Sequence, residues 1–341
     1  MNTPLISVNL LLYKPGFYLK PCLKSIFSQT YKNIELLIID NCSNDGTVDK
    51  AKEIIASAEQ SAPFCKIIAN KENLGFAGGH NLGIRESRGE LVVMVNQDVV
   101  FDENFIQNIV KVFTDNKIGS AQGKLLRLKI ENKKLSKTNI IDNAGLVILK
   151  NRRIIARGQG QKDGAQFAAQ EEIFGVDGAL PVYRRDALRD TKIGDEYFDN
   201  DFFAYKEDVD LAWRLRLFGW QALYVPSAVA WHGRTAGESA ATNYFGIIKE
   251  RIKIGKFAKY LSFKNQRLMQ IKNEQPRLLL KHIFWWLPKE VASWIYVILF
   301  EHYTWKAIRD LFRQAPRAFE KRKIIMARKR MGEKEMGRWF I

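Results

Sequence analysis

The sequence predicts an α/β protein in which a mostly parallel sheet is flanked by helices and followed by a basic helical extension. Apolar runs of strand length alternate with helical periodicity over roughly the first third of the chain. Two of these runs end in acidic side chains, at the position where ligands bind in open α/β sheets. The last part of the chain instead carries dense positive charge and many aromatic residues.

The first two expected strands are residues 7–13 and 35–40, and apolar residues at helical spacing follow each of them. Pro21 suits the first turn of the first helix, and turn-forming residues 44–46 precede the second. The second strand ends at Asp40. A carboxylate there can accept hydrogen bonds from a base or a ribose, or it can form a turn or cap a helix. The residues alone leave both interpretations open.

A short third strand at residues 66–69 leads to Gly75 and Gly78, and then to a helix that carries Asn81 and Arg85. Glycines let the backbone approach a ligand closely, and free N–H groups at a helix start attract anions. The spacing matches neither common glycine-rich phosphate motif, so the indication is weak. Arg85 could reach a phosphate or simply face solvent.

The fourth expected strand is residues 91–95, and Asn96 and Asp98 follow it directly. An acidic side chain there, with an oxygen-bearing neighbour two residues earlier, can hold a hard divalent cation on a diphosphate. In the alternative, Asp98 only begins a surface turn before a helix that starts near Glu103.

Beyond residue 118 the alternation loosens, and the pattern predicts strands at residues 118–126, 141–149, 173–183 and 221–225. A further short strand over residues 229–233 contains His232. A lone histidine is more often structural than a ligand, so only its neighbours could give it a functional role.

An acidic and aromatic stretch from Asp195 leads into a helix that ends at Gly219. Glu207, Asp208 and Asp210 fall in its first turn, where the helix dipole favours carboxylates. Capping explains one or two of these acids. Three of them beside an aromatic loop exceed what capping needs, which indicates a functional role.

The positive charge lies almost entirely at one end of the chain. The 54 Lys and Arg and 37 Asp and Glu give a net charge of +17. Residues 1–244 hold 31 basic and 29 acidic residues, a net of +2, whereas residues 245–341 hold 23 and 8, a net of +15. We therefore expect a nearly neutral catalytic domain over residues 1–244 and a basic, aromatic-rich extension over residues 245–341, which would seek phosphate on lipid or nucleic acid.

Other features of composition favour a cytoplasmic protein with a sizeable core. Hydrophobic residues make up 46% of the chain. The three cysteines, Cys22, Cys42 and Cys65, have no metal-ligand spacing and fit a reducing compartment. The N-terminal residues lack the charged and apolar regions of a signal peptide.

In their order along the chain, these motifs resemble glycosyltransferase family 2, whose members have the GT-A fold and use nucleotide-sugar donors. The resemblance covers residues 5 to about 235. It rests on the motifs at residues 39–47, 73–81 and 96–98, on residues 178–179 with 184–185, and on residues 202–211 with 213–216. The triplet Asn96-Gln97-Asp98 looks most like the rhamnosyltransferase branch, in which Asn-Pro-Asp often replaces Asp-x-Asp.

The resemblance implies a role for several residues. Asp40 would contact the nucleotide base, Asp98 would hold Mg²⁺ or Mn²⁺ on the diphosphate with His232 as a second ligand, and Asp208 would be the catalytic base. The nucleotide-sugar site would also include Asn41, Gly75, Asn81, Arg85, Asn96 and Gly178. Residues on the acceptor side or around it would be Glu207, Asp210, Trp213, Arg214 and Arg216. Glu207 and Asp210 remain competing candidates for the base.

The extension contains an aromatic stretch over residues 278–305 that could be mistaken for a membrane span. Pro288, Lys289 and Glu290 are expected to interrupt it and leave only residues 291–300 continuous, which is short for a spanning helix. Amphipathic helices lying on an anionic membrane surface fit the pattern best. A packed helical appendage is the second interpretation, and nucleic-acid binding is the least favoured.

Together these features predict an inverting, metal-dependent glycosyltransferase at the inner face of the cell membrane. It would move a sugar from a dTDP- or UDP-sugar, with L-rhamnose as the first candidate, to a glycan or lipid-linked acceptor. Nucleotidyl transfer is a rival, although its glycine-rich loop with a following lysine is not evident after the first strand. A non-catalytic nucleotide-sugar or nucleic-acid binder is a second rival, which would have little need for the acids at residues 207–210.

Overall fold

A ten-stranded sheet forms the body of the molecule in the computed structural model, which describes residues 3–58, 61–131, 134–234 and 244–341. The strand order is β10-β12-β6-β11-β4-β1-β2-β3, with β5 beside β12 and β7 beside β6. Its strands are β1 (Ile6–Leu12), β2 (Ile34–Asp40), β3 (Phe64–Ala69), β4 (Leu91–Asn96), β5 (Val99–Phe101), β6 (Ile118–Glu131), β7 (Lys134–Asn143), β10 (Glu171–Glu172), β11 (Pro181–Arg184) and β12 (Gln221–His232).

Strands β1 to β4 make the parallel half that the sequence predicts. β1 pairs in parallel with both β2 and β4, and β2 pairs in parallel with β3. In the second half, β11 runs antiparallel to both β4 and β6, while β12 runs parallel to β6. A separate hairpin joins β8 (Leu146–Ile148) to β9 (Ile154–Ala156).

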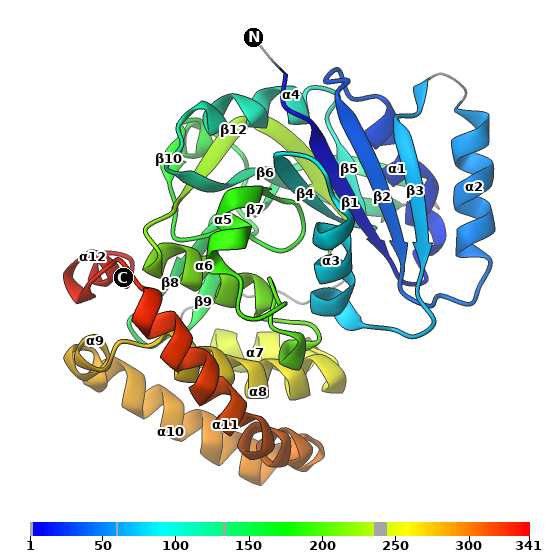
Figure 1. The fold of residues 1–341 in the computed structure, drawn as a ribbon. Coiled ribbons are helices and arrows are strands. Elements are labelled where there is room, and N and C mark those ends of the chain that lie inside the picture. Colours follow the sequence, from blue (N-terminus) through cyan, green and yellow to red (C-terminus); the bar gives the residue numbers. More distant parts are fainter. Residues whose placement is uncertain (1–2, 59–60, 132–133, 235–243) are drawn as a thin grey trace.

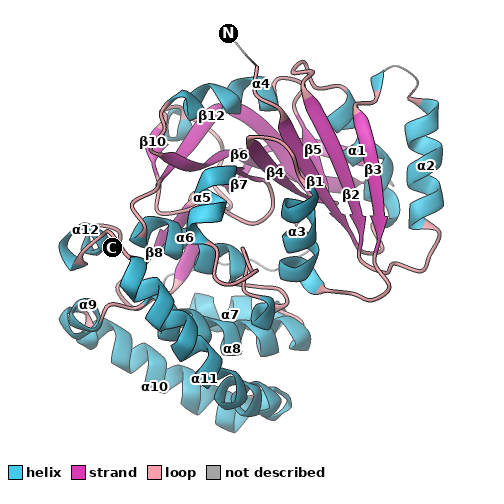
Figure 2. Cartoon of the chain, in the orientation of Figure 1, coloured by secondary structure: helices cyan, strands magenta, loops and turns pink. Residues whose placement is uncertain are grey.

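Helices cover both faces of the sheet, as Figures 1 and 2 show. They are α1 (Leu19–Phe27), α2 (Thr47–Ser57), α3 (Gly75–Glu86), α4 (Phe105–Val110), α5 (Arg185–Thr191) and α6 (Glu207–Leu217), with 3₁₀ turns η1 (Gly16–Tyr18), η3 (Lys111–Thr114), η4 (Ala165–Phe167) and η5 (Asn200–Phe202). The side chains of β4 point alternately to the two faces of the sheet. Leu91, Val93 and Val95 join the core under α1, α2 and α4, whereas Val92 and Met94 join the core under α3, α5 and α6. This alternation follows from the two-residue period of a strand.

The extension is helical, as predicted, and it packs against α6 and the hairpin (Figure 1). Its elements are α7 (Tyr244–Lys253), α8 (Lys256–Asn273), α9 (Pro276–Lys281), α10 (Ile283–Phe300), η6 (His302–Thr304), α11 (Trp305–Arg328) and α12 (Glu333–Gly337). One apolar cluster includes Trp213 of α6, Leu268 of α8 and Ile325 of α11. The last residue, Ile341, donates its backbone N–H to Ile148 of β8. The core is therefore continuous across residue 244.

The expectation that residues 288–290 break the aromatic stretch is wrong. Ile283–Phe300 forms one helix with Pro288 inside it. Glu290 does not disrupt the helix because it turns inward, where it pairs with Arg267 at 2.7 Å and accepts from the Trp294 indole at 2.9 Å. With a mean hydropathy of 1.3, this helix is long and apolar enough to cross a membrane on length and composition alone.

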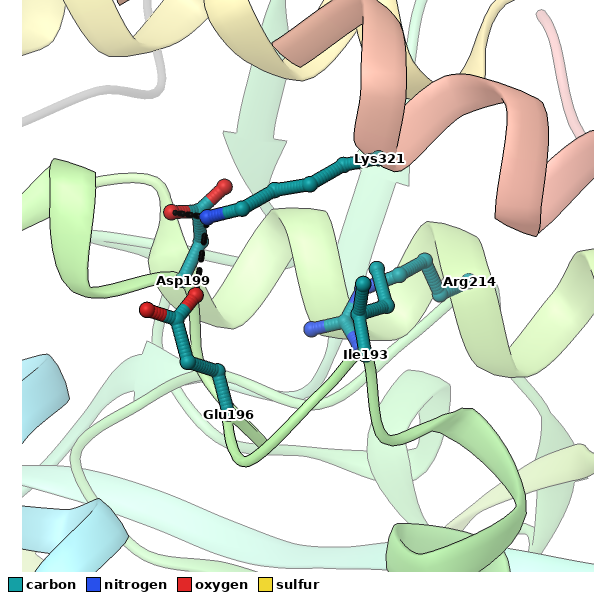
Figure 3. A pocket seen from close by; sticks show the side chains of 5 residues that line it. All are labelled: Ile193, Glu196, Asp199, Arg214 and Lys321. Atoms are coloured by element: carbon teal, nitrogen blue, oxygen red, sulfur yellow. Dashed lines mark hydrogen bonds and ion pairs between the residues drawn. The ribbon is translucent and has the colours of Figure 1, made fainter. Parts of the chain in front are cut away.

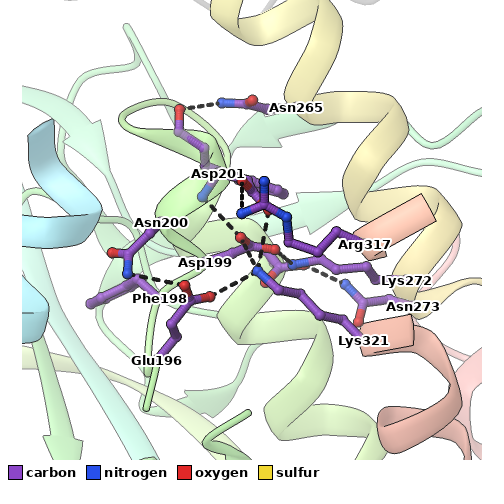
Figure 4. A network of polar contacts seen from close by, with 12 residues as sticks. Glu196, Phe198, Asp199, Asn200, Asp201, Asn265, Lys272, Asn273, Arg317 and Lys321 are labelled. Atoms are coloured by element: carbon purple, nitrogen blue, oxygen red, sulfur yellow. Dashed lines mark hydrogen bonds and ion pairs between the residues drawn. The ribbon is translucent and has the colours of Figure 1, made fainter. Parts of the chain in front are cut away.

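Ion pairs join the extension to the acidic stretch before α6 (Figure 4). Lys272 of α8 is fully buried, and its ammonium lies 2.5 Å from Asp199 and 2.9 Å from Asp210. Lys321 of α11 lies 2.6 Å from Asp199 and 2.8 Å from Glu196. Burial by itself would raise the pKa of Asp199, but the two lysines outweigh burial and hold that pKa well below its usual value.

A small hollow without room for a water molecule lies beside this network (Figure 3). It is lined by Ile193, Glu196, Asp199, Arg214 and Lys321. The four charged side chains are already paired within the chain, since Arg214 lies 3.1 Å from Asp210 and the other three form the Lys321 contacts. The hollow is therefore part of the contact between the extension and the acidic stretch.

Substituting Lys272→Met should lower the free energy of unfolding by about 3–5 kcal/mol, because it leaves two buried carboxylates without their shared cation. Urea denaturation followed by circular dichroism measures the change. Lys323→Met is the matched control, because Lys323 on α11 is exposed and its ion pair is with Glu320 in the same helix. We expect it to change stability by less than about 0.5 kcal/mol. Equal stability of the two variants would contradict the assigned role of Lys272.

Candidate active site

Asp40 lies at the carboxyl end of β2, and its carboxylate is held in a turn. It accepts hydrogen bonds from the Ser43 backbone N–H at 3.1 Å and from the Ser43 hydroxyl at 2.5 Å. The Ser43 hydroxyl oxygen in turn accepts from the Lys14 N–H at 2.9 Å. This joins the loops after β1 and β2 at one edge of the sheet. The turn-forming role that the sequence left open is therefore present, and the side chain is buried.

Asn41 ties this edge to the start of α3. Its amide nitrogen donates to Asn73 Oδ1 at 3.0 Å and to the Gly75 carbonyl at 2.9 Å. Its oxygen accepts from the Asn70 amide at 3.0 Å and from the Leu74 N–H at 3.1 Å. The side chain is buried and its hydrogen bonds hold the loops that surround the edge.

Asn96 is the last residue of β4, and Asp98 lies just beyond it, as predicted. The backbone N–H of Asn96 donates to the Ala179 carbonyl at 3.0 Å. Gln97 exchanges hydrogen bonds with the backbone of Tyr13 at 2.8 and 3.1 Å. Asp98 lies between β4 and β5 in the chain and is buried, with its carboxylate facing His232.

His232, the last residue of β12, lies between two carboxylates. Its Nε2 is 3.4 Å from Asp98 Oδ1, and its Nδ1 is 2.8 Å from Asp142 Oδ2. Burial lowers the pKa of His232, but hydrogen bonds and charge from both carboxylates outweigh burial and raise the pKa to about 10. Arg234 also contacts Asp142, at 3.2 Å. The ring orientation is therefore fixed from the Nδ1 side, with Nε2 toward Asp98.

Asp142 is a candidate site residue that the sequence analysis missed. The predicted strand over residues 141–149 placed it at the start of a strand, whereas it lies next to the end of one in the structure. In the structure β7 ends at Asn143, Gly145 turns the chain at a φ of 119°, and β8 follows. The glycine after Asp142-Asn143 was the available signal for a strand end, although the apolar residues on both sides concealed it.

Asp98 and His232 are the two side chains here that would hold a divalent cation, whose positive charge would offset negative charge on a bound diphosphate. Carboxylate oxygen and imidazole nitrogen both bind Mn²⁺, and Mg²⁺ in nucleotide enzymes uses one or two carboxylates plus phosphate. Within the described ranges no group of three or more His, Cys, Asp or Glu side chains is arranged as a complete metal site. Asp142 would orient the imidazole through its other nitrogen, the common arrangement behind a metal-binding histidine.

Asp208 lies in the first turn of α6 beside Gly178. Its Oδ2 accepts from the Gly178 N–H at 3.1 Å, and its Oδ1 accepts from the Val209 N–H at 2.8 Å. Gly178 precedes Ala179, whose carbonyl accepts the hydrogen bond from the Asn96 N–H. The end of β4 and the start of α6 therefore both contact this segment. Burial and the nearby charge of Asp177 raise the pKa of Asp208 to about 6. A half-buried carboxylate with this pKa can accept a proton near neutral pH.

Glu207 and Asp210, the other two acids of this turn, have different surroundings. Glu207 is buried, and its Oε2 has no hydrogen-bond partner among the residues that the structure describes. Burial and the charge of Asp208 raise the pKa of Glu207 well above its usual value, which favours the protonated form. Asp210 is fully buried and is paired with Arg214 and Lys272. Asp208 alone among the three combines partial exposure with backbone support for a negative charge.

The residues predicted on the acceptor side lie largely in the core. Trp213 is buried in the cluster that joins the extension. The buried Arg214 guanidinium binds Asp210 and the carbonyls of Thr191 and Tyr197. The Arg216 guanidinium binds the carbonyl of Phe174 at 2.9 Å and lies 4.1 Å from the ring centre of Trp339. This placement does not fit direct contact with an acceptor, and these side chains instead fix α6 in position.

Three predicted donor-site residues lie along α3. Gly75 has a φ of 70°, and a Cβ there would lie 2.4 Å from the Phe203 carbonyl oxygen, so a side chain is excluded. Asn81 is buried and accepts from the Phe198 N–H while it donates to the Phe198 carbonyl, both at 2.8 Å. It thereby holds the acidic stretch against α3. Arg85 is exposed on the solvent side of the helix.

Known proteins resemble this chain in sequence and in fold. A model of the family described as glycosyl transferase family 2 matches residues 12–191. The poly-beta-1,6-N-acetyl-D-glucosamine synthase of Staphylococcus epidermidis is 28% identical over 228 residues, 66% of this chain and 49% of that protein. An uncharacterized glycosyltransferase of Haemophilus influenzae is 32% identical over 130 residues, 38% of this chain and 39% of that protein. The match thus spans about half or less of these relatives.

Two solved structures resemble nearly the whole chain. The mannosyltransferase PcManGT from Pyrobaculum calidifontis, in complex with GDP-Man and Mn²⁺, gives a TM-score of 0.54 at 16% identity and covers 99% of this chain and 88% of that one. S. aureus TarS in complex with UDP-GlcNAc gives a TM-score of 0.53 at 15% identity and covers 95% and 84%. At these identities the likeness shows a shared fold.

Substituting Asp142→Asn should weaken Mn²⁺ binding about 10–100-fold, because the imidazole of His232 would lose the carboxylate that fixes its orientation. Titration of Mn²⁺ followed by electron paramagnetic resonance, with nucleoside diphosphate present, measures the affinity. Asp163→Asn serves as the control, because Asp163 pairs with Lys124 rather than with His232. Unchanged affinity in Asp142→Asn would remove the supporting role of Asp142, and no Mn²⁺ binding by the unmodified protein would remove the metal site.

Proposed function

The chain belongs to glycosyltransferase family 2, and we propose that it transfers one sugar from a nucleotide-sugar to an acceptor hydroxyl with inversion at the anomeric carbon. The predicted GT-A fold is confirmed by the shared fold of PcManGT and TarS. The observation that carries the proposal is the placement of Asp208, a half-buried carboxylate of raised pKa beside the segment that also meets the end of β4.

The proposed donor binds across the carboxyl ends of β2 and β4. Asp40 faces the base, the start of α3 around Gly75 approaches the phosphates, and Asp98 with His232 holds Mg²⁺ or Mn²⁺ on the diphosphate. Bound there, the cation neutralises charge on the departing nucleoside diphosphate. PcManGT and TarS were solved with GDP-Man and UDP-GlcNAc, and PcManGT with Mn²⁺, which supports a nucleotide-sugar and a cation here. From the Asn96-Gln97-Asp98 triplet we propose L-rhamnose from dTDP-rhamnose as the first donor to test.

Asp208 acts as the general base in this proposal. Its carboxylate takes the proton from the acceptor hydroxyl while that oxygen attacks the anomeric carbon and the nucleoside diphosphate leaves. One displacement inverts the centre and requires no enzyme nucleophile. Asp210 is excluded because its carboxylate is fully buried and paired with Arg214 and Lys272. Glu207 is disfavoured because burial and the charge of Asp208 raise its pKa well above the usual value.

We propose that the acceptor is a cell-surface glycan or its polyprenyl-linked precursor, reached from the cytoplasmic face of the membrane. The outward side of α10 supports this location. Phe284 is 84% exposed and Phe300 is 69% exposed, which is unusual for large apolar side chains. Other exposed apolar residues on and around this helix are Leu280, Trp285, Leu287, Val291, Ile295, Ile298, Leu299, Tyr303 and Trp305.

Charge around α10 fits an anionic surface. Residues 276–306 are all described, and both of their carboxylates turn inward: Glu290 pairs with Arg267 and Glu301 pairs with Arg251. Arg277, Lys281 and Lys306 of the same segment are exposed. The outer side of this segment therefore combines apolar groups with cations only, as helices that bind anionic lipid do.

An in-plane position suits α10 better than a span. Spanning would surround the helix with lipid and expose the Glu290–Arg267 pair, at a large cost in free energy. The α9 and η6 segments at the two ends of α10 also remain attached to the same body. Lying in the interface, the helix keeps its inner contacts and buries only its outer side.

A donor panel tests the proposed function. The purified protein with Mn²⁺ should release nucleoside diphosphate from one of the UDP-, GDP- or dTDP-sugars, and Asp208→Asn should lower kcat about 10²–10⁴-fold. Because the base must be deprotonated, activity should fall as the pH drops below about 6, the pKa of Asp208. Asp186→Asn, an exposed acid on α5, is the matched control. Full activity in a folded Asp208→Asn variant would refute the assigned base, and neither binding nor turnover of any donor would refute transfer.

Vesicle sedimentation tests the membrane surface. The full chain should bind vesicles of phosphatidylglycerol and phosphatidylcholine but not phosphatidylcholine alone, and high salt should release it. The double substitution Phe284→Ser with Leu299→Ser should reduce binding at least about tenfold by removing buried apolar area. Phe64→Ser, an exposed aromatic on β3, is the control. Equal binding to neutral vesicles or unchanged binding in the double variant would contradict an anionic membrane surface at α10.

A further inference from the structure

The loop between η5 and α6 has a strained backbone directly before the proposed base. Phe203, Tyr205 and Lys206 have φ values of 63°, 67° and 74°, and none of them is a glycine. Phe203, with a ψ of −62°, adopts the rare conformation of a strained γ-turn. Side chains with a Cβ avoid these conformations, so such a loop persists only where its surroundings hold it. Asp208 follows two residues after Lys206.

A single buried amide of the extension holds this loop. Nδ2 of Asn265 on α8 lies 2.9 Å from the carbonyl oxygen of Phe202, 2.9 Å from that of Ala204 and 2.7 Å from that of Tyr205. Figure 4 shows Asn265 reaching the loop from the helix behind it. The amide nitrogen carries two hydrogens and faces three carbonyl oxygens, so at least one hydrogen is shared between two of them.

The orientation of Asn265 is determined by these three carbonyls. Its Oδ1 is buried and has no hydrogen-bond partner in the part of the chain that the structure describes. The reversed amide would set that oxygen against three carbonyl oxygens, which repel it. An unpaired buried oxygen costs free energy, and here the chain accepts that cost to place a donor beneath the loop.

The other side of the loop is held by α3. The Phe203 carbonyl accepts from the Ala77 N–H at 3.0 Å, and the missing side chain of Gly75 lets this carbonyl come close. Loop residues 202–205 are thus fixed from α3 and from Asn265. Asp208 is then held in turn by its bond to Gly178.

We propose that Asn265 is a positioning residue for glycosyl transfer: it holds the strained loop so that Asp208 faces the acceptor hydroxyl. The inference rests on the proposed function and adds a role for the extension. Asn265 lies in the extension and, like Asp208, outside the segment that matches the family model, residues 12–191. Its action is on the geometry of the base, and it touches neither donor nor acceptor.

The chain supplies a matched control on the same helix. Asn273 is also fully buried on α8, and its amide donates to Asp210 at 2.8 Å. Its Oδ1 likewise has no partner within the described ranges. A purely structural role would therefore make the same substitution at Asn265 and Asn273 comparable in effect. A positioning role predicts instead that kcat falls in the Asn265 variant and not in the Asn273 variant.

The experiment compares Asn265→Leu with Asn273→Leu in the full chain, at a temperature where both are folded. Asn265→Leu should lower kcat at least about tenfold and leave the donor KM within about twofold, since proton transfer depends on placement of the base. It should also shift the apparent pKa of the pH–rate profile away from about 6, because that value depends on the surroundings of Asp208. Asn273→Leu should do neither. Equal kcat in the two variants, or a raised KM with kcat unchanged, would overturn the proposal.

Two further measurements keep the test decisive. If Asn265→Leu does not fold, Asn265→Ser and Asn273→Ser take their place, and the same difference in kcat is expected and the same equality overturns it. Amide hydrogen exchange of residues 202–206 gives a readout that needs no turnover. Exchange there should speed up at least about tenfold in the Asn265 variant and not in the Asn273 variant. An inactive wild-type protein would count against glycosyl transfer, whereas equal exchange would count against the positioning role.

Discussion

Negative charge buried at the start of α6 is the constraint on which both the site and the extension depend. A buried carboxylate must be paired, must keep its proton or must reach solvent. Each of the three acids of this turn meets this requirement in a different way. Asp210 is paired with Arg214 and Lys272, Glu207 is buried with a raised pKa, and Asp208 remains half-exposed on two backbone N–H groups. One helical turn thus yields one carboxylate suited to accept a proton.

The basic extension supplies cations that pair with buried carboxylates in and before this turn. Its charge looks uniform in the sequence, but in the structure some of its basic side chains are buried and others are exposed. Lys264, Lys272 and Lys321 are buried and turn toward the acidic stretch before α6, where they bind carboxylates or carbonyls. Arg277 and Lys306 turn outward beside the apolar side of α10. The buried lysines cannot face a membrane, so net charge alone overstates the charge available to anionic lipid.

Much of the fold and part of the site could be predicted from the sequence, because they depend on local patterns. Alternating strands and helices predict the parallel half of the sheet, and acids at strand ends predict the location of Asp40 and Asp98. Asp142 could not be placed, because the apolar residues around it look like one continuous strand. Nor could Asn265, whose function depends on three carbonyls about 60 residues earlier in the chain. The continuity of α10 was missed because whether Glu290 breaks a helix depends on Arg267, a residue on another helix.

Helix α8 connects the two regions for which we propose a role. One side of it holds the loop before Asp208 through Asn265, and another side packs against α10, where Arg267 pairs with Glu290 and the Phe263 and Trp294 ring centres lie 5.1 Å apart. These are buried contacts with defined geometry, so α8 fixes the position of α10 relative to Asp208. In the proposed in-plane orientation, the depth of α10 in the interface therefore sets the height of the base above the lipid. The proposed lipid-linked acceptor would have its diphosphate at that same interface, so one helix would match the position of the base to that of the acceptor hydroxyl.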